Sequence, residues 1–209
     1  MSGEPAVGGR NDDPEDDDTD QHLRWGRLTS IGMSVLSFLG LAAAFTLSVD
    51  KVRLLEDPGF EPSCNFNPVL SCGSVMATDQ AAAFGFPNPF LGVIGFSIML
   101  TVSVVLASGV RLPQWIMIGA ATGSILGVAF VHWLIFQSLY RIGALCPWCM
   151  VVWGVTVPLA LWFTLKAADG VRRLARSLWE WRLTLIGLWY VAVLVLVLIR
   201  FWDYWSTLV

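Results

Sequence analysis

Charged residues are scarce in this 209-residue chain: Asp, Glu, Lys and Arg make up 14% of it, whereas hydrophobic residues make up 56%. In an ordinary soluble domain about a quarter of the residues are charged. So few charges cannot cover a water-exposed surface, and the mean hydropathy of +0.65 indicates an integral membrane protein. The Lys and Arg residues flank the apolar segments and leave no basic surface, which argues against nucleic-acid binding.

Acidic residues are concentrated near the N-terminus. Seven of the ten residues 11–20 are Asp or Glu, so the formal net charge of -3 mostly describes this one segment. A strongly charged segment without apolar residues cannot bury enough surface to fold. We therefore predict a disordered cytoplasmic tail at residues 1–24, followed by a membrane domain at residues 25–209.

The sequence also lacks the strict apolar–polar alternation of half-buried strands, and it shows no internal repeat. Five apolar runs are long enough to cross about 30 Å of hydrocarbon, and none has Asp or Glu in its apolar core. They lie at residues 28–49, 90–110, 114–139, 148–166 and 183–202. Because backbone polar groups in lipid must be satisfied internally, the runs predict an all-α integral membrane protein with five transmembrane helices.

The distribution of Lys and Arg predicts the orientation of these helices. The first run follows more than twenty polar residues and has no clear cleavage site after it, so we interpret it as an anchor. With the N-terminus inside, the inner side carries nine basic residues and the outer side four: Arg10, Arg24, Arg27, Arg111, Lys166, Arg172, Arg173, Arg176 and Arg182 against Lys51, Arg53, Arg141 and Arg200. This bias favours a cytoplasmic N-terminus and an extracytoplasmic C-terminus.

Only four cysteines are present, as two pairs: Cys64 and Cys72 in the loop 50–89, and Cys146 and Cys149 in a Cys-Pro-Trp-Cys motif. In the predicted orientation both pairs are extracytoplasmic, where disulfides form and persist. Cys146 precedes a helix that begins with Pro147, and the partial positive charge of a helix N-terminus lowers a thiol pKa. Cys149 lies about 4.5 Å deeper along the helix. We therefore expect Cys146 to face the outer loop and Cys149 to face the bilayer, where a lipid-soluble acceptor would lie.

The first pair lies in a segment rich in Pro and Asn, which predicts a turn-rich, mobile loop. The Ala-rich residues 75–84 after it are expected to form a short helix that caps the bundle. Four cysteines allow three pairings. An electron relay needs two of them: resting disulfides Cys64–Cys72 and Cys146–Cys149, and a transient Cys72–Cys146 disulfide, since thiol–disulfide exchange proceeds through mixed disulfides.

Two other uses of four cysteines stay open. They could form two structural disulfides that staple an extracytoplasmic loop. A zinc site with four cysteine ligands is a weaker alternative, because the seven-residue gap between Cys64 and Cys72 is long for a zinc knuckle and the second pair borders lipid. We predict no metal site.

At these residues the chain resembles the vitamin K epoxide reductase family, in the bacterial form that supports disulfide-bond formation. The resemblance covers about residues 28–163. It rests on the seven-residue spacing of Cys64 and Cys72, the turn Phe86-Pro87-Asn88-Pro89, and the motif Cys146-Pro147-Trp148-Cys149. It implies a four-helix transmembrane bundle around a quinone, menaquinone or ubiquinone, with a fifth peripheral helix.

The family resemblance also implies roles for the cysteines. A DsbA-like thioredoxin-fold partner would reduce the loop pair, the loop pair would reduce the second pair, and the quinone would take the electrons. Cys64 would face the partner, Cys72 would pass electrons to Cys146, and Cys149 would meet the quinone.

The resemblance further assigns quinone contacts to Asn88, Thr78, Trp153 and Cys149. Asn88 matches a family asparagine that hydrogen-bonds a quinone oxygen, although Asn before Pro is also an ordinary turn residue. Thr78 matches a position where the family often has Ser, and a helix-surface Thr is the plain alternative. Trp153 stands where animal members carry Tyr, so its contact to the quinone is expected to differ.

His132 is the sole ionisable side chain well inside a predicted span. Ionisable groups inside membranes are functional candidates by default, and one interpretation is a proton path to the quinone. The other is a neutral His that bonds a neighbouring helix. We do not count it as catalytic.

The sequence thus predicts a multi-pass thiol:quinone oxidoreductase of the cytoplasmic membrane, with its active site on the extracytoplasmic face. Some bacterial relatives carry a fused thioredoxin domain after the fifth span, and none is expected here, so a separate partner is implied. Two alternatives remain: vitamin K epoxide or quinone reduction as the main activity, or a non-catalytic, disulfide-stapled membrane scaffold.

Overall fold

The computed structural model describes residues 14–168 and 172–206. Its elements are α1 Pro14–Glu56, α2 Cys72–Met76, the 3₁₀ helix η1 Asp79–Ala82, α3 Pro89–Ala107, α4 Gln114–Phe136, the π-helix η2 Gln137–Ile142, α5 Pro147–Ala167, α6 Arg172–Arg200 and α7 Trp202–Ser206. Within the described ranges there are no strands, only two isolated β-bridges. Five of the helices are long and apolar enough to cross a membrane, which confirms the predicted all-α membrane fold.

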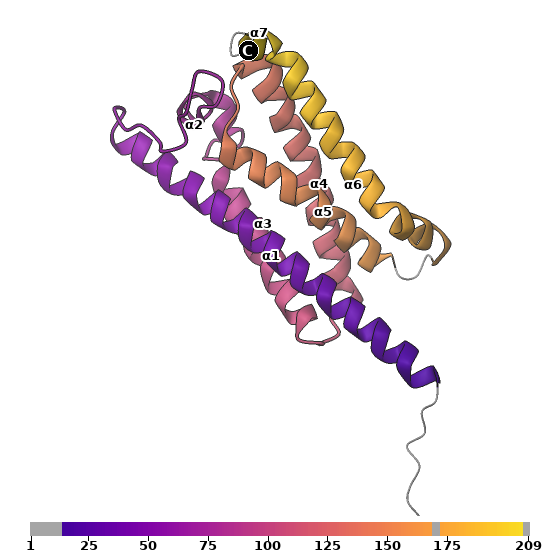
Figure 1. Cartoon of the computed structure of the whole chain (residues 1–209). Coiled ribbons are helices and arrows are strands. Elements are labelled where there is room, and N and C mark those ends of the chain that lie inside the picture. Colours follow the sequence, from indigo (N-terminus) through magenta and orange to yellow (C-terminus); the bar gives the residue numbers. More distant parts are fainter. Residues whose placement is uncertain (1–13, 169–171, 207–209) are drawn as a thin grey trace, which may run out of the picture.

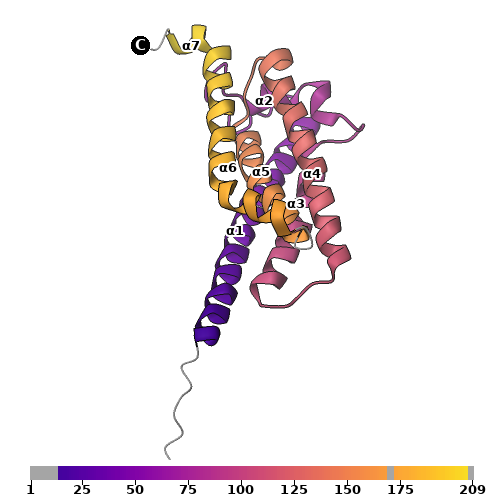
Figure 2. The same ribbon diagram turned by 90° about the vertical axis from the view of Figure 1, so that its right-hand side faces the viewer.

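The helices run alongside one another as a bundle (Figures 1 and 2). Helices α1, α3, α4 and α5 surround the core, and α6 lies on the outside: 6% of its apolar window is buried, compared with 44% for α5. The loop with α2, the start of α5 and helix α7 lie at one end of the bundle, whereas the α3–α4 connection lies at the other (Figure 1). Both cysteine pairs therefore belong to the same end.

Small residues let α1 and α3 approach closely. A Cβ atom at Gly40 would lie 2.4 Å from the ring of Phe96, and one at Gly92 would lie 2.9 Å from Cβ of Ala44. Lipid tails are as apolar as the helix surfaces, so close packing of this kind, rather than exclusion from water, holds membrane helices together. The contact fixes the start of α3 against the second half of α1, where the cavity and the cysteine cluster begin.

Helix α1 is longer than the sequence predicts. It begins at Pro14 and ends at Glu56, so residues 14–24 are helical rather than disordered, and residues 50–56 are helical rather than part of the loop. Proline is favoured in a first helical turn, because its missing N–H would have no partner there. Pro58 then prevents the helix from continuing. Residues 1–13 of the predicted tail lie outside the described residues.

Side-chain hydrogen bonds fasten α6 to the bundle. Nε1 of Trp189 donates to Nε2 of His132 at 3.0 Å, and Nε of Arg200 donates to the carbonyl of Leu139 at 2.8 Å. An indole N–H can only donate, so Nε2 of His132 accepts, and its Nδ1–H donates to the carbonyl of Val128 at 2.8 Å. Both ring nitrogens are occupied. His132 therefore joins α4 to α6, which favours the structural interpretation over the proton path.

Candidate redox active site

The loop cysteines Cys64 and Cys72 are joined by a disulfide bond. Two asparagine side chains hold the loop around it. Oδ1 of Asn67 accepts from the N–H groups of Val69 and Leu70 at 3.0 and 2.7 Å. Oδ1 of Asn65 accepts from the N–H of Gly73 at 2.9 Å. The segment predicted to be mobile is therefore a hydrogen-bonded turn in this structure.

Two backbone hydrogen bonds connect this loop to the residues just before α5. The N–H of Leu145 donates to the carbonyl of Val69 at 2.7 Å, and the N–H of Ser71 donates to the carbonyl of Leu145 at 2.9 Å. Ser71 precedes Cys72, and Leu145 precedes Cys146, so the two bonds place the two cysteines beside each other. Sequence reasoning missed this contact, because a bridge between segments more than seventy residues apart leaves no local signal.

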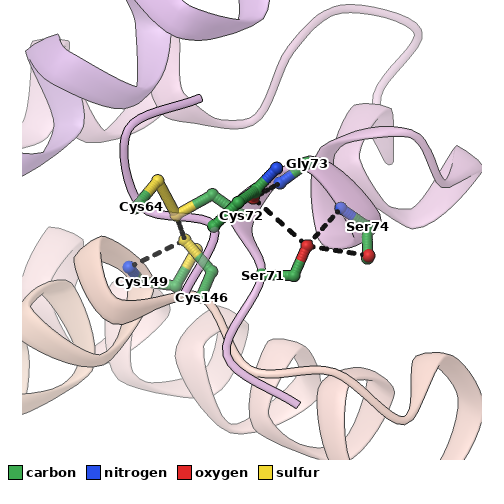
Figure 3. The surroundings of a disulfide bond; sticks show 8 residues. Cys64, Ser71, Cys72, Gly73, Ser74, Cys146 and Cys149 are labelled. Atoms are coloured by element: carbon green, nitrogen blue, oxygen red, sulfur yellow. Dashed lines mark hydrogen bonds between the residues drawn. A yellow bond between two sulfur atoms is a disulfide. The ribbon is translucent and has the colours of Figure 1, made fainter. Parts of the chain in front are cut away.

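Sulfur atoms from the two pairs meet at this point (Figure 3). Sγ of Cys146 lies 3.2 Å from Sγ of Cys72, and the backbone N–H of Cys149 donates to Sγ of Cys146 at 3.4 Å. The structure thus brings together the two cysteines expected to form the transient disulfide. Cys146 and Cys149 are free thiols, so the expected resting disulfide between them is not formed here. In this state the Cys64–Cys72 pair is oxidised, and the Cys146–Cys149 pair, here called the inner pair, is reduced.

Cys146 is the N-cap of α5, and Pro147 stands in the first helical turn, as the sequence predicted. The pKa of the Cys146 thiol is lowered, first by its hydrogen bond with the Cys149 side chain and further by the backbone N–H groups of Cys149 and Trp148. Burial of the thiol and the negative charge of Asp50 oppose this shift. The net lowering increases the thiolate fraction of Cys146, and the thiolate is the form that attacks disulfides.

The sulfur cluster is closed to the outside. Cys72 and Cys146 are fully buried and Cys64 is 3% exposed, in a cluster with Leu47 of α1 and Met76 of α2. A partner thiol cannot reach Cys64 in this arrangement. The role of Cys64 as the partner-facing sulfur, which the sequence predicts, therefore requires the loop to move.

A cavity of about 210 Å³ lies between α1, α3, α4 and α5, directly beside the second cysteine of the motif. Cys149, Asn88 and Trp153 all line it. Cys146 contacts the loop disulfide instead. Cys146 thus contacts the loop disulfide and Cys149 lines the cavity, whereas the sequence predicts that Cys149 faces the bilayer. Thr78 is not among the described residues that line the cavity, and its hydroxyl donates to the carbonyl of Val75 at 2.8 Å.

Asn88 and Trp153 bring polar groups to this mainly apolar cavity. Asn88 is buried; its Nδ2 donates to the carbonyl of Gln80 at 2.7 Å, and its Oδ1 accepts from the N–H of Ala83 at 3.0 Å. An amide nitrogen carries two hydrogens, so one of them remains for a ligand. Nε1 of Trp153 is buried and has no hydrogen-bond partner among the described residues. The structural role of Asn88 and a ligand contact are therefore compatible.

Sequence reasoning also missed Lys51 as a cavity residue. Lys51 lines the cavity, and its Nζ donates to the carbonyl of Met76 at 2.6 Å. The signal was present, because Asp50 and Lys51 are the first charged residues after the first apolar run. The sequence predicts both in the outer loop, because it does not predict the last turns of α1.

The state of the four cysteines argues against the zinc site and against the two structural disulfides. A zinc site with four ligands needs four thiolates, whereas Cys64 and Cys72 are bonded to each other. A pair of structural staples needs a second disulfide, whereas Cys146 and Cys149 are free. A disulfide and a dithiol in contact are instead what thiol–disulfide exchange requires.

Comparison with known proteins agrees with this chemistry. Residues 31–164 match the family model described as the vitamin K epoxide reductase family. The matched segment runs from within α1 to within α5 and includes α3, α4, both cysteine pairs and the residues that line the cavity. A search of curated proteins finds no match.

Proposed function

The chain belongs to the vitamin K epoxide reductase family, and on that premise we propose that it reoxidises a thioredoxin-like partner outside the cytoplasm and passes the electrons to a membrane quinone. Membership makes it a multi-pass membrane oxidoreductase of thiols and quinones. The observation that carries the proposal is the 3.2 Å contact between Sγ of Cys72 and Sγ of Cys146. Cys149, which pairs with Cys146, lines the cavity.

The reaction balances over three exchanges. Two thiols of the partner reduce the Cys64–Cys72 disulfide, and the partner leaves with a disulfide. Cys72 then attacks Cys146 of an oxidised inner pair and Cys64 resolves the mixed disulfide, so two electrons and two protons move inward. The Cys146–Cys149 dithiol finally reduces the quinone to the quinol and becomes a disulfide again. The structure has the loop pair oxidised and the inner pair reduced, which corresponds to the step before quinone reduction.

The cavity supports quinone as the electron acceptor. It is mainly apolar and adjoins Cys149, and it offers an N–H group from Asn88. An apolar pocket with a few placed polar groups is typical of sites for small hydrophobic ligands. We assign Asn88 and Trp153 as quinone contacts, with Cys149 as the sulfur that meets the ring. Thr78 stays a prediction without support from the cavity lining.

The test is electron transfer by the full chain in lipid nanodiscs with a quinone. A reduced thioredoxin-fold protein is the electron source, and quinol formation is followed by absorbance. We expect Cys149→Ala to abolish quinol formation. Cys64→Ala should retain quinone binding and lose reduction by the partner.

Ser63→Ala is the matched control for the second variant, because Ser63 precedes Cys64 and its side chain is exposed. It should retain the wild-type rate. Wild-type activity in either cysteine variant would rule out the relay. If the wild-type chain forms no quinol and its cysteine pairs never exchange, the protein is a disulfide-containing scaffold instead.

A further inference from the structure

One carboxylate lies beside the sulfur cluster without a part in the chemistry described so far. Asp50 lies in α1 and is 7% exposed. Among the residues with described side chains it is the only charged one that is buried. Its Oδ2 atom is buried and has no hydrogen-bond partner among the described residues. Burial of a carboxylate is costly unless the group is paired, so an unpaired oxygen in this place indicates a use in the reaction rather than in stability.

The position of Asp50 points to the reacting sulfurs. It follows Leu47 by three residues, so both side chains lie on the same face of α1. Leu47 packs in the cluster with Cys64, Cys72 and Cys146. The charge of Asp50 acts on Cys146 directly, because it raises the pKa of that thiol.

The sulfur cluster on this face of α1 holds Cys64 and Cys72 from the loop and α2, and Cys146 and Cys149 at the start of α5. The basic residues near Asp50 on α1 are Lys51 and Arg53, and the guanidinium group of Arg53 lies over the ring of Phe60. Nζ of Lys51 donates to the carbonyl of Met76. The Lys51 amine is thus bonded elsewhere, and Oδ2 of Asp50 has no hydrogen-bond partner among the described residues.

Electron transfer from the loop pair to the inner pair needs a group that accepts and donates protons. Cys72 and Cys146 are fully buried, so the thiols cannot exchange protons with bulk water where they react. Before Cys72 attacks, its thiol must lose a proton, and the sulfur displaced from Cys146 must gain one. Resolution by Cys64 requires a second transfer of the same kind.

We propose that the carboxylate of Asp50 accepts and returns these protons during this electron transfer, an assignment that rests on the function proposed above. In the first step Asp50 takes the proton of Cys72, the Cys72–Cys146 bond forms, the Cys146–Cys149 bond breaks, and the proton goes to the departing sulfur. In the second step Cys64 attacks Cys72, and Asp50 carries the proton of Cys64 to Cys146. Two electrons and two protons reach the inner pair, and no other reagent is consumed.

The decisive variant is Asp50→Asn, which keeps the size of the side chain and removes its basicity. In nanodiscs, the oxidised full chain is mixed with excess reduced thioredoxin-fold protein, and the thiols of each pair are trapped by alkylation at set times. We expect transfer from the loop pair to the inner pair to slow about 100-fold at pH 7, a typical loss for a missing general base. Raising the pH should recover most of that loss, because thiolate then forms without the base. Asp50→Glu should recover part of the rate at pH 7.

Glu56→Gln is the matched control, since Glu56 is an exposed carboxylate on the same helix. It should transfer at the wild-type rate. Transfer by Asp50→Asn at the wild-type rate at pH 7 would overturn the assignment, as would a slowing that is the same at every pH, which indicates a structural role. Quinol formation by the wild-type chain is measured in parallel. If it is absent, the proposed function itself fails, whereas normal quinol formation with an unimpaired Asp50→Asn removes only the role of Asp50.

Discussion

The indole of Trp153 carries a buried N–H group that has no acceptor among the described residues. A buried donor without a partner lowers stability by about 1–3 kcal/mol, and a quinone oxygen in the adjoining cavity would satisfy it. We therefore expect Trp153→Phe to raise the KM for quinone about tenfold, the equivalent of about 1.4 kcal/mol. The apo protein should be at least as stable as the wild type, because the variant removes the unsatisfied group. Steady-state kinetics and thermal unfolding without quinone measure the two effects.

Trp205→Phe is the control for this variant. Nε1 of Trp205 is also buried without a hydrogen-bond partner, but Trp205 is not among the described residues that line the cavity. It should leave the KM unchanged. An equal KM for wild type and Trp153→Phe would contradict the contact between the indole and the quinone.

At the residue scale, local chemistry was predictable and long-range contacts were not. The sequence predicted that Cys146 begins a helix and that Cys149 lies deeper, because Pro147 and the helical rise are local features. It did not predict the bridge between Ser71 and Leu145, which places Cys72 on Cys146. Such backbone contacts depend on how distant segments pack. The unpaired oxygen of Asp50 likewise follows from burial rather than from any motif.

The loop acts as one element, and Asn65 holds it together. Its Oδ1 atom accepts hydrogen bonds from the N–H of Gly73 and the hydroxyl of Ser71, on either side of Cys72. Asn65→Ala removes both bonds, each worth about 1 kcal/mol. We expect the loop to open more often, so that a bulky water-soluble phosphine reduces the Cys64–Cys72 disulfide about tenfold faster. Transfer to the inner pair should slow.

Asp57→Ala is the control, because Asp57 also accepts a backbone hydrogen bond in the loop, from Gly59, but lies away from Cys72 in the sequence. It should change neither rate. Unchanged reduction of the disulfide in Asn65→Ala would show that loop opening does not depend on these bonds.

The hydrogen bond between Trp189 of α6 and His132 of α4 allows a test of the role of His132. Its hydrogen bond from Trp189 joins the two helices, and its other nitrogen is engaged with Val128. His132→Leu should lower stability by about 0.6 kcal/mol, a typical value for such bonds in membranes, and leave quinone turnover within about twofold of wild type. Combination with Trp189→Phe in a double-mutant cycle isolates the bond. A loss of turnover of tenfold or more would instead support the proton path.

The lengths of the helices were less predictable than their existence. Apolar runs indicate where a chain lies in hydrocarbon, whereas a helix can continue into water as long as its backbone bonds and end charges allow. Helix α1 extends to Pro14 at one end and Glu56 at the other for this reason. The seven further residues after the first apolar run, residues 50–56, bring Asp50 and Lys51 into the site rather than into a loop.

At the scale of the whole molecule, the loop with α2 and the start of α5, which carry the two cysteine pairs, lie at one end of the bundle, and the α3–α4 connection lies at the other (Figure 1). In the topology that the sequence predicts, nine Lys and Arg residues, among them Arg111 and Lys166, belong to the end opposite the cysteines, and four, among them Lys51 and Arg53, belong to the cysteine end. A bias of positive charge toward the cytoplasm predicts that the cysteine end is extracytoplasmic.

Two exposed positions, one at each end of the bundle, test this orientation. Glu56 closes α1 near the loop, and Ser108 lies in the α3–α4 connection. In intact cells that express the chain, a membrane-impermeant maleimide should label Glu56→Cys and leave Ser108→Cys unlabelled above the wild-type background. After permeabilisation both should react, which shows that each thiol is accessible. The reverse pattern would place the disulfide loop in the reducing cytoplasm, where a resting Cys64–Cys72 disulfide would not persist, and would contradict a partner outside the cell membrane.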